Sequence, residues 1–148
     1  MRIHLGSDHA GFALKEQVRA LLEERGHEVT DVGTDGEESV DYPDYAGIVG
    51  RAVADGVADF GVLICGTGLG MAIAANKVHG VRAVQAYDPE MAHMARLHND
   101  ANVLTLPGRY LSAEEAAPVI DAFLGTAFEW GRHQRRVDKI AALADDNE

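Results

Sequence analysis

The sequence predicts one α/β domain over residues 1–148, a Rossmann-like three-layer sandwich in which helices cover both faces of a five-stranded parallel sheet. Apolar runs of strand length alternate with segments of helical periodicity along the whole chain. The run FGVLIC, residues 60–65, is uninterrupted, as expected for a central parallel strand that is covered on both faces. A length of 148 residues is that of one ordinary domain, and no linker or internal repeat divides it.

The expected elements follow one another in a regular order. Strands are expected at residues 2–5, 28–33, 60–65, 81–87 and 102–106. Helices are expected, from apolar side chains that recur on one face, at residues 12–25, 45–57, 69–78, 89–98, 113–124 and 131–143. Gly26 and Gly125 end two of these helices, and Ser112 with Glu115 forms a capping box at the start of the fifth.

The charge balance argues against several classes of partner. A net charge of -11 disfavours nucleic acid and anionic membranes, since both require a basic surface. No apolar stretch is long enough to cross a bilayer, the N-terminus lacks a signal-peptide core, and a single cysteine cannot form an internal disulfide. We therefore expect a cytoplasmic protein. One basic segment, residues 132–139, departs from the acidic balance and is compatible with a small anionic ligand.

The loop after the central strand reads CGTGLG, residues 65–70. Ligands of an open parallel sheet bind beyond the carboxyl ends of its strands, so this loop is a candidate site. A dinucleotide loop needs its third glycine one position later than Gly70, and the Lys-Ser or Lys-Thr of a P-loop is missing. The loop can still present several backbone N–H groups at the start of a helix, which suits a phosphate or a developing oxyanion.

Cys65, the only cysteine, has two interpretations. A cysteine on an apolar strand is usually an inert core residue. Beside a loop of N–H donors at the start of a helix, a cysteine is favoured as a reactive thiolate. The glycine loop makes the second interpretation the better one.

Two polar pairs, Asp8 with His9 and His98 with Asn99, are further candidates for chemistry. Each pair alone is explained equally well by a structural role; His98, for example, suits a solvated cap at a helix end. The functional interpretation requires both pairs to reach the edge of the sheet that carries the Cys65 loop, and this is what we expect.

The spacing of the remaining histidines and arginines bears on metal and phosphate binding. His93 and His98 are five residues apart on one helix and point to different faces, so we expect no catalytic metal. Arg132 and Arg136 are four residues apart and share a helix face. They form either a solvated basic stripe or a fork for phosphate.

These motifs together resemble the ribose-5-phosphate isomerase B family, which includes galactose-6-phosphate isomerase subunits. The resemblance covers nearly the whole chain, in the order and spacing of the family. The matching motifs are GSDHAGF, ERGHEVTDVGT, DYPDYA, ICGTGLGMAIAANK, GVRA, HNDANVL and GRHQRRV.

The resemblance implies an aldose-ketose isomerase without metal or organic cofactor. It would interconvert D-ribose 5-phosphate and D-ribulose 5-phosphate through a cis-enediolate, in the non-oxidative branch of the pentose phosphate pathway. Allose, galactose and erythrose phosphates are alternative substrates, and a non-enzymatic module that binds phosphosugars or nucleotides is an alternative function. The resemblance also implies a homodimer, with tetramers in some members, whose sites lie at the interface and receive arginines from the final helix.

Residue roles follow from the same resemblance. Cys65 would be the base that moves a proton between C1 and C2, and Thr67 and His98 would open the furanose ring, with His98 as proton donor. The enediolate oxygen would be held by Gly66, Thr67, Gly68, Leu69, Gly70 and Asn99. Sugar hydroxyls and phosphate would be bound by Asp8, His9, Arg109, Arg132 and Arg136. One branch of the family has a glutamate base where this chain has Leu69, so the chain falls in the cysteine branch. Arg135 and Tyr42 receive no role.

Overall fold

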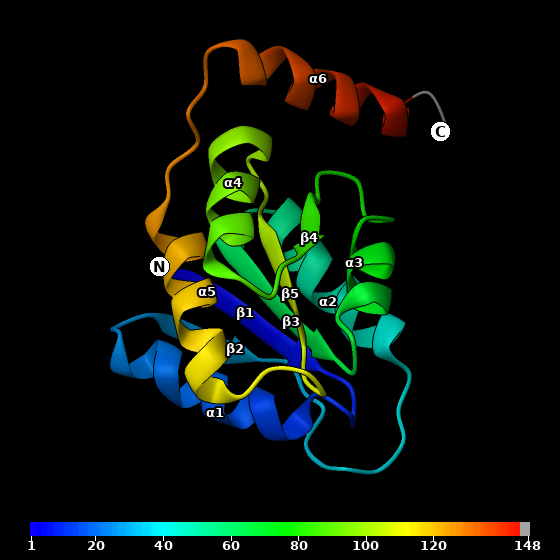
Figure 1. Cartoon of the computed structure of the whole chain (residues 1–148). Helices are drawn as coiled ribbons and strands as arrows, with labels where there is room; N and C mark the ends of the chain where they lie inside the picture. Colours follow the sequence, from blue (N-terminus) through cyan, green and yellow to red (C-terminus); the bar gives the residue numbers. More distant parts are fainter. Residues whose placement is uncertain (146–148) are drawn as a thin grey trace.

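The sheet has five parallel strands in the order β2-β1-β3-β5-β4 (Figure 1). The computed structural model describes residues 1–145. The strands are β1 (Arg2–Ser7), β2 (Glu28–Asp31), β3 (Phe60–Cys65), β4 (Ala83–Gln85) and β5 (Val103–Pro107). The expected fold class is confirmed, and the uninterrupted apolar run is the central strand β3. The fourth strand is shorter than expected, because only residues 83–85 pair with β5.

Helices cover both faces of the sheet. On one face lie α1 (Phe12–Glu24), α4 (Pro89–Asn99) and α5 (Ala113–Gly125), and on the other lie α2 (Tyr42–Ala54) and α3 (Leu69–Ala75). Each face has its own core of buried apolar side chains, because alternate residues of each strand point to opposite faces. Ile64 belongs to the core under α1, α4 and α5, whereas its neighbour Cys65 belongs to the core under α2 and α3.

Local sequence signals account for the ends of several helices. The Ser112 hydroxyl accepts a hydrogen bond from Glu115 N at 3.2 Å, and the Glu115 carboxylate accepts one from Ser112 N at 3.1 Å, which confirms the capping box. Gly26 follows α1 with a φ of 83°, a left-handed conformation that glycine adopts without strain. The second helix begins at Tyr42, earlier than expected, because Pro43 fits the first turn of a helix.

The last helix, α6 (Arg132–Asp145), lies apart from the sandwich, across the end where α4 finishes (Figure 1). Only His133 and Val137 of this helix are buried. Within residues 1–145, no helix combines the length and the apolar character needed to span a bilayer.

Candidate active site

The carboxyl ends of β1, β3 and β5 meet at one edge of the sheet, where their following loops are in direct contact. Asp8 N donates to Ile64 O at 3.2 Å, and Gly108 N donates to Cys65 O at 2.8 Å. A Cβ on Gly11 would lie 2.4 Å from Ile64 O, so only glycine allows the loop after β1 to approach β3 this closely. This edge therefore brings the loops at Asp8, Cys65 and Gly108 together.

Cys65 ends β3 and is only 5% exposed. Its Sγ accepts a hydrogen bond from Gly68 N at 3.2 Å. A backbone N–H aimed at the sulfur supports negative charge on it, as the thiolate interpretation requires. Gly68 has a φ of 76° and is held from the other side by the Thr105 hydroxyl, which donates to Gly68 O at 2.7 Å. The donor to the sulfur is thus held in place by a buried contact with β5.

Several backbone N–H groups of the glycine loop are not used in hydrogen bonds within the described chain. The N–H groups of Gly66, Thr67 and Gly70 have no acceptor among residues 1–145. The Thr67 hydroxyl accepts a hydrogen bond from Leu69 N at 3.2 Å. The Arg109 side chain packs against the loop at Gly66, so closely that a Cβ on Gly66 would lie 3.0 Å from Arg109 Nη1. Free N–H groups and a guanidinium beside a buried thiol form a setting that suits an anionic intermediate.

Asp8 and His9 follow β1 at the same edge. Asp8 is largely buried, and its Oδ1 accepts a hydrogen bond from Gly11 N at 3.1 Å. His9 Nδ1 accepts a hydrogen bond from Val40 N at 3.2 Å. A neutral His9 with an accepting Nδ1 carries its proton on Nε2, so Nε2 is a donor for a ligand oxygen.

Tyr42, to which the sequence assigned no role, packs on the glycine loop. A Cβ on Gly70 would lie 2.4 Å from Tyr42 Cε1 and 3.0 Å from its hydroxyl oxygen. The first residue of α2 therefore forms part of the wall of the candidate site. A sequence signal for this contact is the third glycine of the loop, which leaves room for a neighbouring ring.

His98 and Asn99 lie at the opposite edge of the sheet, so the expectation that they join the Cys65 loop within one chain is wrong. A helix between parallel strands runs antiparallel to them, and α4 ends beside the amino end of β5. In the register of the sheet, Gly61 pairs with Val103 and Cys65 with Pro107. Four residues of strand at about 3.3 Å each place these two pairs about 13 Å apart along the strands. His98 precedes Val103 in the chain and lies beyond the Gly61–Val103 pair, on the side away from Cys65.

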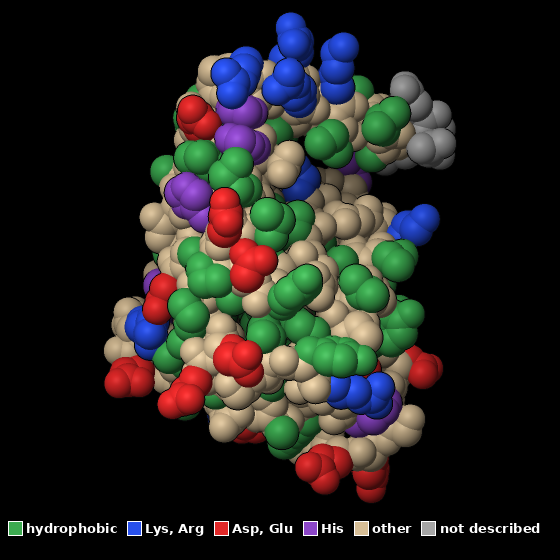
Figure 2. Space-filling view, in the orientation of Figure 1, with side chains coloured by type: hydrophobic (Ala, Val, Ile, Leu, Met, Phe, Trp, Pro, Cys, Tyr) green, Lys and Arg blue, Asp and Glu red, His purple; other side chains and the backbone are tan. Residues whose placement is uncertain are grey.

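Arg132 and Arg136 are also at this amino edge. Both are exposed on α6, and with Arg135 and Lys139 they form the basic group at the top of Figure 2. The structure therefore brings together Asp8, His9, Cys65, Thr67 and Arg109 at one edge. It leaves His98, Arg132 and Arg136 at the other edge.

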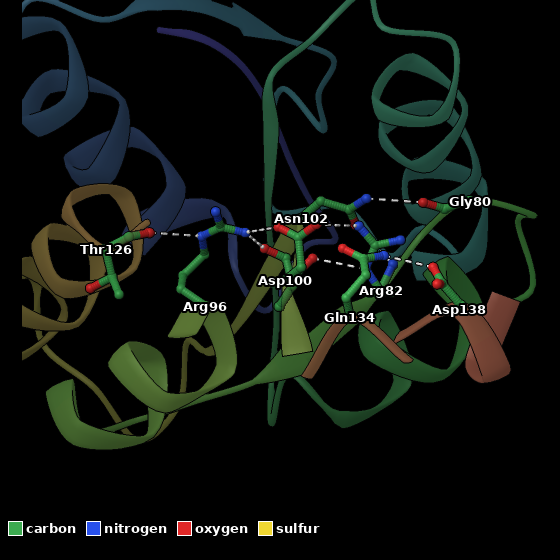
Figure 3. Close-up of polar contacts among 9 residues, drawn as sticks. Gly80, Arg82, Arg96, Asp100, Asn102, Thr126, Gln134 and Asp138 are labelled. Carbon is green, nitrogen blue, oxygen red and sulfur yellow. Dashed lines mark hydrogen bonds and ion pairs between the residues drawn. The ribbon is translucent and has the colours of Figure 1, made fainter. Parts of the chain in front are cut away.

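An ion-pair network fixes the end of α4 (Figure 3). Asp100 adopts a left-handed φ of 48°, which is costly for a residue with a Cβ. Its carboxylate accepts hydrogen bonds from Arg96 Nη1 at 2.9 Å and from Arg82 Nη2 at 3.3 Å. Arg96 is itself buried, and its Nε donates to Thr126 O at 3.1 Å. The two arginines hold the turn that directly follows His98 and Asn99.

His98 also belongs to a cluster that sequence analysis missed. Its Nε2 lies 3.6 Å from Glu129 Oε2, and His133 Nε2 lies 3.3 Å from the same oxygen. The two imidazole rings are stacked, with centroids 4.2 Å apart and an interplanar angle of 14°. The four-residue spacing of Glu129 and His133 is the signal that pairs them, but only the tertiary structure adds His98.

Comparison with known proteins gives a consistent result. The family described as Ribose/Galactose Isomerase matches residues 3–140. Ribose-5-phosphate isomerase B of Escherichia coli is 51% identical over 142 residues, which cover 96% of this chain and 95% of that protein. The structure of ribose-5-phosphate isomerase B from Clostridium thermocellum, 47% identical, superimposes with a TM-score of 0.98 over 100% of both chains. A structure of the Mycoplasma genitalium enzyme with bound ribulose-5-phosphate is 41% identical, with a TM-score of 0.94 over 98% of this chain and 97% of that one.

Proposed function

The chain belongs to the ribose/galactose isomerase family, and from this premise we propose that it interconverts D-ribose 5-phosphate and D-ribulose 5-phosphate with Cys65 as the base. It is an isomerase, as its close relatives are. The observation that carries the role of Cys65 is the buried sulfur that accepts a hydrogen bond from Gly68 N at the meeting point of three loops. A cytoplasmic location remains a prediction of the sequence.

Proton transfer between two adjacent carbons is the central step. Cys65 Sγ removes the C2 proton of the open-chain aldose, and the electrons of that C–H bond form the C1–C2 double bond as negative charge develops on O1. Cys65 returns the proton to C1 while a proton passes from O2 to O1, which gives the ketose. The free N–H groups of Gly66, Thr67 and Gly70 are the donors for the enediolate oxygen. No other reactant is needed.

Ring opening precedes this step, because ribose 5-phosphate is mainly a furanose. The C1–O4 bond breaks, and O4 takes a proton from His98. The O1 hydroxyl gives its proton to solvent by way of the Thr67 hydroxyl. Asp8 and the Nε2 donor of His9 bind sugar oxygens, and Arg109 adds positive charge at the loop. We assign Asn99, Arg132 and Arg136 to the enediolate and the phosphate.

The site is shared between two copies of the chain in this proposal. Support comes from the separation of Cys65 and His98, which lie at opposite edges of one sheet and so cannot act on one sugar within one chain. A face for the second copy is available beside the Cys65 loop. Exposed apolar side chains lie on α3, at Leu69 and Ile73, and at the start of α4, at Tyr87 and Met91, and apolar side chains are spread over the middle of the face in Figure 2. A twofold pairing would place His98 and α6 of each copy at the Cys65 loop of the other.

A panel of sugar phosphates tests the proposed activity. We expect the purified protein to isomerise ribose 5-phosphate faster than allose 6-phosphate, galactose 6-phosphate and erythrose 4-phosphate, measured as ketose formed. The description of the family makes galactose phosphate the second candidate. If no member of the panel is converted, the proposed function is refuted, and a calorimetric titration with ribose 5-phosphate then tests the alternative of a module that only binds phosphosugars.

Cys65→Ala tests the assigned base within the same panel. The variant should lose turnover but still bind ribose 5-phosphate in a calorimetric titration, because the sulfur acts on C–H bonds and does not hold the phosphate. A variant with near-normal turnover removes Cys65 from the mechanism. A variant that neither turns over nor binds shows that the thiol supports the loop rather than the chemistry.

A further inference from the structure

Three side chains from separate segments meet at the end of α4. His98 comes from the last turn of α4, Glu129 from the segment between α5 and α6, and His133 from the first turn of α6. Glu129 Oε2 lies 3.6 Å from His98 Nε2 and 3.3 Å from His133 Nε2. The basic helix α6 thus touches the sandwich at the residue assigned as proton donor.

Burial differs sharply within this cluster. His133 is 5% exposed, and its Nε2, although it lies 3.3 Å from Glu129 Oε2, makes no hydrogen bond within residues 1–145. The side chains of His98 and Glu129 are 32% and 52% exposed. The buried ring of His133 is therefore a fixed surface, against which the accessible ring of His98 stacks at a centroid distance of 4.2 Å.

A metal ion is the first occupant to consider, because the three ligand atoms lie within 4.8 Å of one another. An imidazole nitrogen binds a metal along its lone pair, in the plane of the ring, at about 2.0 to 2.1 Å for zinc. The two rings here are nearly parallel, at 14°, and stacked face to face. No point at bonding distance from both nitrogens lies in both ring planes. The geometry therefore fits a cluster in which Glu129 and His133 hold the ring of His98, rather than a metal site.

We propose that Glu129 and His133 are positioning residues for His98 in ring opening, an inference that rests on the proposed function. The face of His133 sets the plane of the His98 ring. The Glu129 carboxylate, 3.6 Å from His98 Nε2, sets the rotation of that ring within the plane, and so the direction of the nitrogen that gives its proton to O4. Neither residue touches the atoms that react on C1 and C2.

The two substrates separate this role from a merely structural one. Ribose 5-phosphate is a furanose and must be opened. Ribulose 5-phosphate cannot close to a furanose, because its O5 carries the phosphate, so it reaches the Cys65 step without ring opening. The open-chain aldose that it forms can leave the enzyme and close in solution, so consumption of ribulose 5-phosphate does not require His98. A defect in positioning His98 should therefore slow the reaction from ribose 5-phosphate much more than the reaction from ribulose 5-phosphate.

Glu129→Gln is the main test variant, because it keeps the shape of an exposed side chain and removes its charge. We expect kcat/KM for ribose 5-phosphate to fall about tenfold or more, the size of a lost interaction with a charged group, and initial rates from ribulose 5-phosphate to fall less than about threefold. Glu129→Asp should recover part of the loss. An equal fall with both substrates, or no fall with either, overturns the proposal.

His133→Asn is the second variant, and it should show the same split between the two substrates. Because His133 is buried, its thermal unfolding is measured beside the rates; if the variant does not fold, the Glu129→Gln result alone decides. His93→Asn and Glu90→Gln, both on α4 and outside the cluster, are matched controls that should leave both rates unchanged.

Zinc alone is a further probe. We expect no tight site in a calorimetric titration, and one ion per chain that disappears in both Glu129→Gln and His133→Asn overturns the geometric argument. A wild-type protein that converts neither pentose phosphate refutes the proposed function itself, an outcome distinct from the loss of the substrate split.

Discussion

Subunit mixing gives a direct test of the shared site. The experiment uses two variants, Cys65→Ala and His98→Asn, each of which we expect to be inactive on ribose 5-phosphate as a homodimer. Co-expression with two different affinity tags and purification on both tags gives the heterodimer. One of its two sites then receives an intact Cys65 from one copy and an intact His98 from the other.

The expected magnitude follows from the topology. Cys65 and Gly61, the second residue of β3, are about 13 Å apart along the strand, and His98 lies beyond the level of Gly61, so one chain does not close the site. Under twofold symmetry the heterodimer has one intact and one doubly defective site, which predicts about half of the wild-type activity per dimer. The assay is the initial rate of ribulose 5-phosphate formation from ribose 5-phosphate.

The reciprocal heterodimer is the matched control. It pairs a wild-type chain with a chain that carries both Cys65→Ala and His98→Asn. A shared site leaves each of its two sites with one defect and therefore predicts almost no activity, whereas a site within one chain predicts half. Activity in this control and none in the first heterodimer would refute the shared site, as would a monomeric protein that is fully active.

Three further predictions concern the phosphate, the loop and a half-buried histidine. Arg136→Ala should raise KM for ribose 5-phosphate about 10- to 150-fold, which corresponds to the loss of about 1.5 to 3 kcal/mol from a hydrogen bond to a charged group. An unchanged KM in steady-state kinetics would make Arg136 a solvated surface residue. Gly68→Ala should lower the free energy of unfolding in urea by about 1 to 2 kcal/mol or more, because the φ of Gly68 is 76° and a Cβ would lie 2.9 Å from the backbone carbonyl carbon of Leu106. In the control variant Gly125→Ala the new Cβ meets nothing within 4 Å, so the free energy of unfolding should change by less than about 0.5 kcal/mol. Equal effects in the two variants would contradict the argument. Burial lowers the pKa of His4 below 6.5, so the unfolded chain binds a proton near that pH that the folded chain does not, and the free energy of unfolding should fall as the pH drops through this range. His4→Val should reduce that fall between about pH 7.5 and pH 5.5, and an unchanged slope would exclude His4 as its source.

Interactions between neighbours in the sequence explain what could be predicted. The capping box at Ser112 and the glycine that ends α1 each depend on a few consecutive residues, and both are confirmed. The apolar run of β3 marks a strand covered on both faces, and it is the central one. The loop at Cys65 follows from this placement, because the end of a central strand is where a parallel sheet binds ligands.

Contacts between distant segments explain what could not be predicted in the same way. The packing of Tyr42 on Gly70 and the stacking of His98 on His133 each join segments from separate helices. The placement of His98 at the far edge follows from the antiparallel direction of a crossover helix. That rule was available at the sequence level, but the polar composition of His98 and Asn99 suggested the edge of Cys65 instead.

The α/β class, the glycine loop beside a lone cysteine and the set of residue types for sugar-phosphate chemistry could all be predicted, because they depend on local patterns and on motif order. Which of those residues share an edge became known from the folded chain. It joined Cys65 to Gly68 and placed His98, Glu129 and His133 together at the opposite end of the sheet. The physical reason is that strand direction and long-range packing, rather than residue type, set the distance between groups that must act on one substrate.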